Sequence, residues 1–138
     1  MQIDKLRIQR FLYEIKKNTI EIEDILKDKQ AEAQLDPLIF KAVKYMLVEI
    51  AEAMSNILQH ILAQDKGIPV SGYIETILKA REYKIISEST FKNLKPFFDF
   101  RNSLIHRYWQ IDDNILYKNL MAGLKDFNKF IEEIENIL

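Results

Sequence analysis

Apolar residues recur along most of the chain at intervals of three and four positions, the spacing of one face of an α-helix. This pattern predicts helices over residues 3–27, 37–64, 71–82, 90–108 and 112–138. No stretch of useful length alternates apolar and polar positions, as a half-buried strand would. We therefore expect an all-α fold, a single-domain bundle of four to five helices that spans residues 1–138.

The expected helix boundaries rest on capping residues and breakers. Asp36 precedes Pro37, and this pair favours a helix start, because Asp caps free N–H groups and Pro needs none at the first position. Ser87 and Ser89 both suit the N-cap of the helix over residues 90–108. Pro96 falls inside that helix, where it either kinks the helix or marks its true start.

The composition agrees with long helices, because only 3 glycines and 3 prolines occur among 138 residues. Cysteine is absent, which excludes disulfides, thiolate metal ligands and a cysteine nucleophile. The first residues do not resemble a signal peptide, and no stretch approaches the roughly 18 apolar residues of a membrane span. We expect a soluble protein of the cytoplasm with no membrane partner.

Charge is distributed unevenly, although the net charge is only −1. Residues 79–108 carry 7 basic and 3 acidic side chains, and they form the only positive segment of the chain. A generic polyanion binder would be more basic overall. The positive segment indicates either a local anion site or the chance clustering of charges on solvated faces.

Four chemically useful residues lie close together at the end of the positive segment: Arg101, Asn102, His106 and Tyr108. At about 100° per residue, Asn102 and His106 are neighbours on the helix surface, and Tyr108 lies beside Arg101. Histidine transfers protons near neutral pH, arginine binds phosphate with a planar fork, and asparagine can orient either the imidazole or a substrate.

The same helix carries a second apolar stripe, made of Phe98, Ile105 and Trp109. Such a stripe, if exposed, indicates a partner surface. We therefore expect a homodimer through the motif helix, which brings two copies of Arg101 and His106 to one cleft. In the alternative, rotation of the helix or a kink at Pro96 moves the stripe into the core.

Two glutamates and a second histidine lie on the apolar helix over residues 37–64. We expect Glu49 and Glu52 at the surface; if either is buried, Arg101 or His106 is its natural partner. His60 is expected to pack or face solvent. The chain has no metal-binding motif and no glycine-rich phosphate loop, so no cofactor and no metal ligand is assigned.

The spacing of the four residues is a weak signal alone, because an arginine and a histidine five residues apart also fit a solvated helix end. Arg101-x4-His106-x-Tyr108, with Asn102 after the arginine, resembles the R-x4-H-x-Y motif of the HEPN ribonuclease superfamily, in particular its HepT-like toxins. The opening helix, the run Val48-Glu49-Ile50-Ala51-Glu52-Ala53 and residues 97–112 resemble the same family.

The resemblance implies a HEPN-like, homodimeric, metal-independent endoribonuclease toxin that cleaves RNA by 2′-OH attack and leaves 2′,3′-cyclic phosphate ends. Arg101, Asn102 and His106 would be the catalytic residues. The resemblance also implies a partner, an MntA-like nucleotidyltransferase antitoxin that silences the toxin by AMP transfer to Tyr108. Two other hypotheses remain open: a non-catalytic nucleotide- or partner-binding helical module, and a structural bundle in which Arg101 and His106 only stabilise the fold.

Overall fold

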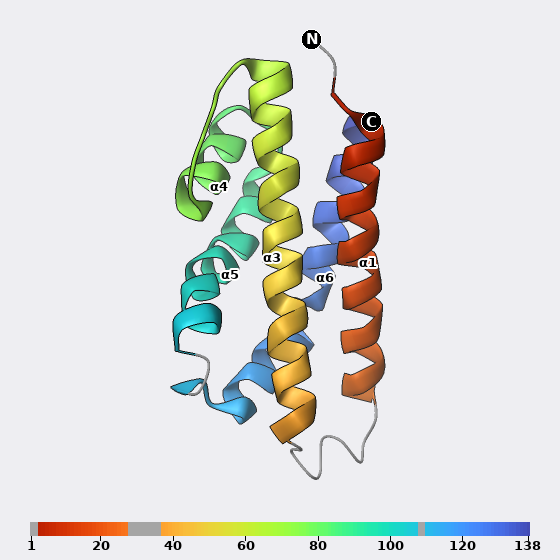
Figure 1. The fold of residues 1–138 in the computed structure, drawn as a ribbon, viewed down its shortest axis with the longest axis vertical. Coiled ribbons are helices and arrows are strands. Elements are labelled where there is room, and N and C mark those ends of the chain that lie inside the picture. Colours follow the sequence, from red (N-terminus) through yellow and green to blue (C-terminus); the bar gives the residue numbers. More distant parts are fainter. Residues whose placement is uncertain (1–2, 28–36, 108–109) are drawn as a thin grey trace.

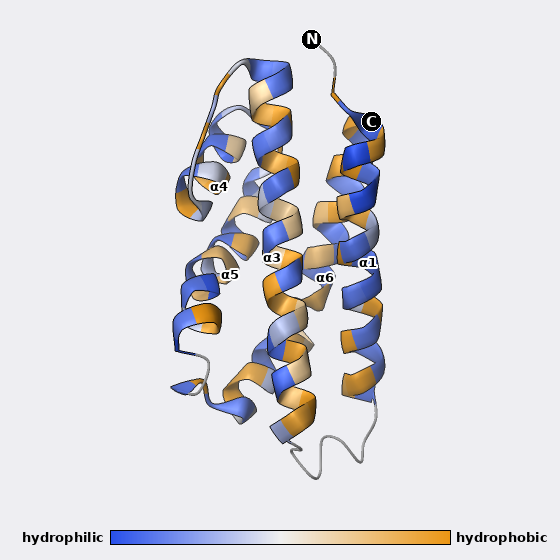
Figure 2. Cartoon of the chain, viewed as in Figure 1, coloured by the Kyte–Doolittle hydropathy of each residue, from blue (hydrophilic) through white to orange (hydrophobic). Residues whose placement is uncertain are grey.

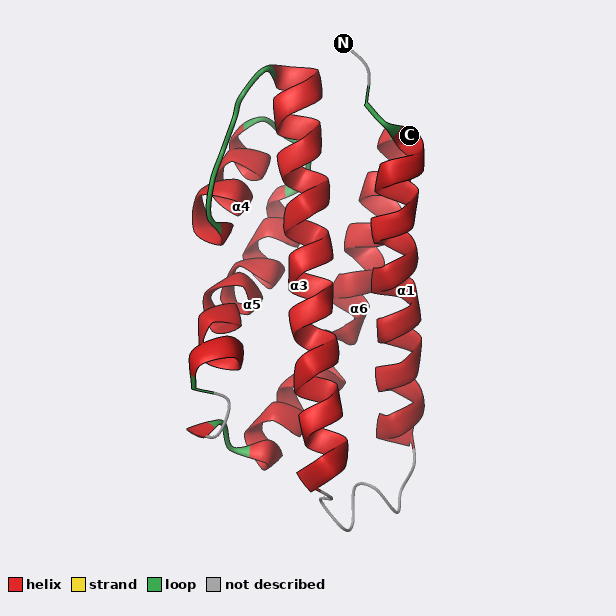
Figure 3. Cartoon of the chain, in the orientation of Figure 1, coloured by secondary structure: helices red, strands yellow, loops and turns green. Residues whose placement is uncertain are grey.

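A computed structural model describes residues 3–27, 37–107 and 110–138 of the chain. Within these residues the secondary structure is entirely helical, and no strand occurs (Figure 3). The helices are α1 (Lys5–Lys27), α3 (Pro37–Lys66), α4 (Tyr73–Glu82), α5 (Glu88–His106) and α6 (Asp113–Ile137). The all-α prediction is confirmed. No helix in the described ranges is long and apolar enough to cross a membrane.

Helix α3 is the longest helix and the centre of the bundle. It packs against α1 on one flank and against α4 and α5 on the other, while α6 packs against both α1 and α5 (Figure 1). Its apolar face is buried along its length, and orange apolar residues line the inside of the neighbouring helices (Figure 2). The larger apolar side chains of α3 that are fully buried recur at helical spacing: Val43, Leu47, Ile50, Met54, Ile57, Leu58, Ile61 and Leu62.

The boundaries of α5 settle two alternatives left open by the sequence. Ser87 is the N-cap, since its hydroxyl accepts a hydrogen bond from the backbone N–H of Thr90 at 3.1 Å. The helix begins at Glu88, so Pro96 does not mark its start. The helix ends at His106, two residues before the expected end, because the chain leaves helical geometry at Arg107. The expected cap at Asp36 lies outside the described residues.

The expected exposed stripe on α5 is wrong at Phe98. This side chain is only 1% exposed and lies in the core, edge-to-face with the ring of Tyr73 at a centroid distance of 6.3 Å. Helix α4 packs against α5 and covers this face. Ile105 is partly exposed, and Trp109 lies outside the described residues. The stripe alone therefore no longer argues for a dimer.

Glu133 of α6 ties the start of α5 to the bundle. Its carboxylate accepts hydrogen bonds from the backbone N–H of Ser87 at 2.7 Å, from the Ser87 hydroxyl at 2.8 Å and from the Thr90 hydroxyl. Burial alone would raise the pKa of Glu133, but these hydrogen bonds outweigh it and hold the pKa below its usual value. The charged form is therefore the one that stabilises the fold.

The substitution Glu133→Gln is expected to lower the free energy of unfolding at pH 7 by about 1.5 kcal/mol, because it removes the charge from these hydrogen bonds. A depressed folded pKa gives stability that is present above the unfolded value, near about 4.3, and is lost as the pH falls through the folded pKa. The difference between wild type and variant should therefore shrink below about pH 4. Urea unfolding across pH measures it, with the exposed neighbour Glu132→Gln as control; a difference independent of pH would contradict the assignment.

Candidate active site

The last turns of α5 present the motif residues identified in the sequence. Arg101 is largely buried, with a side chain 19% exposed, whereas Asn102 and His106 are exposed. His106 is the last residue of the helix. Tyr108 lies outside the described residues.

The guanidinium of Arg101 is held by groups from three helices. Its Nη2 donates to the Oε1 of Glu52 on α3 at 3.3 Å, and its Nη1 donates to the Oδ1 of the adjacent Asn102 at 3.0 Å. Its central carbon lies 3.8 Å from the ring centroid of Tyr73, the first residue of α4, which is a cation–π contact. Of the two partners considered for Glu52, the structure selects Arg101.

The phenol of Tyr73 takes part in the same cluster. Burial, a hydrogen bond with Glu52 and the negative charge of Glu52 raise the pKa of Tyr73 to about 12, although the positive charge of Arg101 opposes the shift. The phenol is therefore neutral at physiological pH. No pattern in the sequence points to Tyr73, because its contact with Arg101 depends on how α4 packs on α5.

Arg101 and His106 lie on different sides of α5. Five residues of helix turn by about 140° from one to the other, at about 100° per residue. Accordingly, Arg101 faces α3 and α4, whereas His106 is exposed at the free end of the helix. Within one protomer, the guanidinium of Arg101 and the imidazole of His106 therefore lie on different sides of α5.

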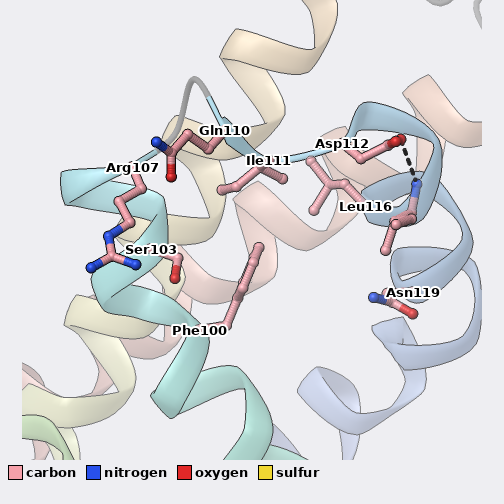
Figure 4. Close-up of a pocket in the computed structure, with 9 residues that line it drawn as sticks. Phe100, Ser103, Arg107, Gln110, Ile111, Asp112, Leu116 and Asn119 are labelled. Atoms are coloured by element: carbon pink, nitrogen blue, oxygen red, sulfur yellow. Dashed lines mark hydrogen bonds between the residues drawn. The ribbon is translucent and has the colours of Figure 1, made fainter.

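A pocket of about 300 Å³ opens between the end of α5 and the start of α6 (Figure 4). Phe100, Ile111 and Leu116 form its apolar part. Ser103 and Arg107, on either side of His106 in the sequence, border it from α5. The other lining residues are Gln110, Asp112, Ile115 and Asn119. The sequence does not reveal this pocket, since its lining comes from two helices and the segment between them.

Asp112 and His60 have structural roles. The carboxylate of Asp112 accepts a hydrogen bond from the backbone N–H of Ile115 at 3.3 Å, which caps α6. The Nε2 of His60 accepts a hydrogen bond from the backbone N–H of Asp4 at 2.9 Å, just before α1 begins. In the part of the chain that the structure describes, no group of three or more His, Cys, Asp or Glu side chains could hold a metal ion.

Four of the seven basic side chains of the positive segment form ion pairs within the chain. Lys79 pairs with Glu82 at 3.0 Å, Arg81 with Glu88 at 2.9 Å and Lys95 with Asp99 at 2.9 Å. Together with the pair of Arg101 and Glu52, they leave fewer cations for a polyanion than the sequence count implies. The alternative interpretation, charges on solvated faces, is correct for these three pairs.

Comparisons with known proteins match the chain to ribonucleases of one family. A family model described as Ribonuclease HepT-like matches residues 15–134. The tRNA nuclease HepT of Aphanizomenon flos-aquae is 26% identical over 132 residues, which cover 95% of this chain and 84% of that protein.

Solved structures match over nearly the whole chain. A tri-AMPylated HEPN toxin of Shewanella oneidensis, in complex with its MNT antitoxin, is 23% identical with a TM-score of 0.84; the match covers 94% of this chain and 97% of that one. A toxin–antitoxin MntA–HpeT structure, with one tyrosine changed to alanine, is 25% identical with a TM-score of 0.81, covering 94% and 98%. The expected HEPN-like architecture is confirmed.

Proposed function

The chain belongs to the HepT-like ribonuclease family, and from this premise we propose that it is a metal-independent endoribonuclease with Arg101, Asn102 and His106 as catalytic residues. The observation that carries the proposal is a guanidinium held in place by three helices, on the same helix as an exposed imidazole at its end. These are the two groups that RNA cleavage requires from a protein, a stabiliser of phosphate charge and a proton carrier.

RNA supplies its own nucleophile, so the proposed reaction needs no protein nucleophile. His106 acts in proton transfer: a base takes the proton of the 2′-OH, the 2′ oxygen attacks the phosphorus, and the departing 5′ oxygen receives a proton. Arg101 stabilises the negative charge that grows on the phosphate oxygens. Asn102 holds one edge of the guanidinium. The products are a 2′,3′-cyclic phosphate and a 5′-OH end.

A second copy of the chain completes the proposed site. Because Arg101 and His106 lie about 140° apart around α5, a homodimer through the motif helix lets the arginine of one protomer meet the histidine of its partner. The exposed Asn102 and His106, together with the partly exposed Ile105, would lie at this interface. Phe98 does not contribute, since it is buried within its own protomer.

We further propose that the chain is the toxin of a toxin–antitoxin pair and acts on RNA in the cytoplasm. Its partner would be an MntA-like nucleotidyltransferase that moves AMP from ATP to the hydroxyl of Tyr108, with release of pyrophosphate. The two solved relatives, an AMPylated toxin with an MNT antitoxin and an MntA–HpeT pair, support this partner. AMP on Tyr108, two residues after His106, would add negative charge and bulk beside the site.

One observation favours a second candidate, a non-catalytic nucleotide- or partner-binding module over the single domain 1–138. The pocket beside Ser103 and Arg107 has an apolar part and a polar border, and its volume of about 300 Å³ is at the lower end of the range for ligand pockets. A module of this kind binds nucleotide or antitoxin without turning over RNA.

RNA digestion with unmodified protein in excess EDTA separates the two candidates. We expect cleavage to proceed at the same rate with and without the chelator and to leave cyclic phosphate ends, because the proposed chemistry uses side chains alone. Purification without the antitoxin and intact-mass analysis establish that Tyr108 carries no AMP. Absence of cleavage over a broad panel of tRNA and mRNA would favour the binding module, and loss of cleavage in EDTA would contradict metal independence.

A further inference from the structure

We propose that Glu52 and Tyr73 are positioning residues that fix the guanidinium of Arg101 for contact with the RNA phosphate, an inference that rests on the proposed function. Neither residue belongs to the motif at the end of α5. Both come from other helices, Glu52 from α3 and Tyr73 from α4. Their joint contact with Arg101 is therefore a product of the tertiary fold.

The hydrogen bonds leave the guanidinium able to bind a phosphate. Each terminal nitrogen of arginine carries two N–H groups. Glu52 engages Nη2 and Asn102 engages Nη1, so one N–H remains on each terminal nitrogen. These two remaining N–H groups can donate hydrogen bonds to phosphate oxygens. With 19% of its side chain exposed, Arg101 retains a limited opening to solvent.

The aromatic ring of Tyr73 packs against the guanidinium of Arg101 and restricts its movement. Its ring centroid lies 3.8 Å from the central carbon of Arg101, and the ring packs edge-to-face against the buried Phe98. Because the raised pKa of about 12 keeps the phenol protonated, its hydroxyl is a hydrogen-bond donor for Glu52 at physiological pH. The carboxylate of Glu52 thus interacts with both the phenol of Tyr73 and the guanidinium of Arg101.

Two other roles for Glu52 can be weighed on the same geometry. As a purely structural ion pair it would contribute little, because its side chain is 47% exposed and exposed pairs are screened by solvent. As a competitor it would occupy the phosphate site of Arg101 and inhibit the enzyme. The remaining free donor on each terminal nitrogen argues against competition. Positioning has a clear benefit, because a free arginine must lose substantial rotamer freedom on binding phosphate.

The test is Glu52→Gln, assayed for kcat and KM on RNA beside the wild type. Loss of the charged partner lets the guanidinium move, so we expect kcat to fall by about 10- to 100-fold with little change in KM. The matched control is Glu49→Gln, nearly one turn earlier on α3, which is expected to keep the wild-type kcat. Tyr73→Phe keeps the aromatic ring and loses only the hydroxyl. It should lower kcat less than Tyr73→Leu, which also removes the ring that contacts the guanidinium.

A second measurement separates positioning from a simple loss of folded protein. A phosphorothioate at the cleaved linkage weakens the contact between Arg101 and a phosphate oxygen, so the wild type should cleave phosphate faster than phosphorothioate. In Glu52→Gln this ratio of rates should move towards one. A reduced active fraction lowers both rates equally and leaves the ratio unchanged.

The outcomes distinguish the positioning role from the proposed function. Absence of cleavage by the wild type would contradict both the positioning role and the proposed function. Cleavage by Glu52→Gln at the wild-type rate and rate ratio would remove only the positioning role, and an increased rate would identify Glu52 as a competitor of phosphate. A fall in rate with an unchanged rate ratio would reduce Glu52 to a structural residue.

Discussion

Replacement of His106 by alanine is expected to lower RNA cleavage by about 100- to 10,000-fold while the helical fold survives. His106 is exposed at the end of α5, so truncation removes no core packing, and the expected change in unfolding free energy is within about 0.5 kcal/mol. The rate falls because no positioned imidazole is then available for proton transfer, either from the 2′-OH or to the departing 5′ oxygen. Single-turnover cleavage of a labelled RNA, with circular dichroism of both proteins, measures the two effects separately.

The other histidine provides a matched control within the same chain. His60 is partly buried and accepts a hydrogen bond from the backbone of Asp4, far from the end of α5. We expect His60→Ala to reduce stability modestly and to leave the cleavage rate of the folded protein unchanged. Equal losses of activity in the two variants would trace the effect to folding. Full activity in His106→Ala would show that the imidazole of His106 takes no part in cleavage.

The helices of this fold could be predicted because their information is local. The apolar spacing along α3 and α1 is visible in the sequence, and Ser87 marks the start of α5 there as well. The burial of Phe98 could not be predicted from the local sequence pattern. A helical wheel orders the residues of α5 relative to one another, but only the packing of α4 decides which of its apolar faces is covered.

In the candidate site, too, some residues can be identified from the sequence and others only from the fold. Arg101, Asn102 and His106 lie within six residues of one another, so their spacing marks them as a group in the sequence itself. Glu52 is a reasonable partner for Arg101, because a glutamate on an apolar helix needs a cation nearby. Tyr73 could not be found in this way, since an aromatic residue at a helix start is common and its role comes from the position of α4. That the motif residues act in catalysis stays a prediction for experiment.

Mixing two inactive variants is expected to restore activity if the site is shared between protomers. In a heterodimer of Arg101→Ala with His106→Ala, the first chain still supplies its histidine and the second still supplies its arginine. A cleft that takes the two groups from different protomers is therefore intact once per heterodimer. Random exchange of equal amounts places half of the protein in heterodimers with one good site each, so about a quarter of the wild-type rate should return.

The geometry of α5 is the reason to expect this recovery. With Arg101 turned towards α3 and α4, and His106 about 140° further round the helix, the two groups of one chain point apart. The control mixes Arg101→Ala with a chain that carries both substitutions, because no pairing in that mixture unites an arginine with a histidine from either protomer. Activity in the first mixture alone assigns the two groups to different subunits. If native mass spectrometry detects heterodimers and neither mixture cleaves RNA, each protomer must hold its own complete site, and the shared cleft is wrong.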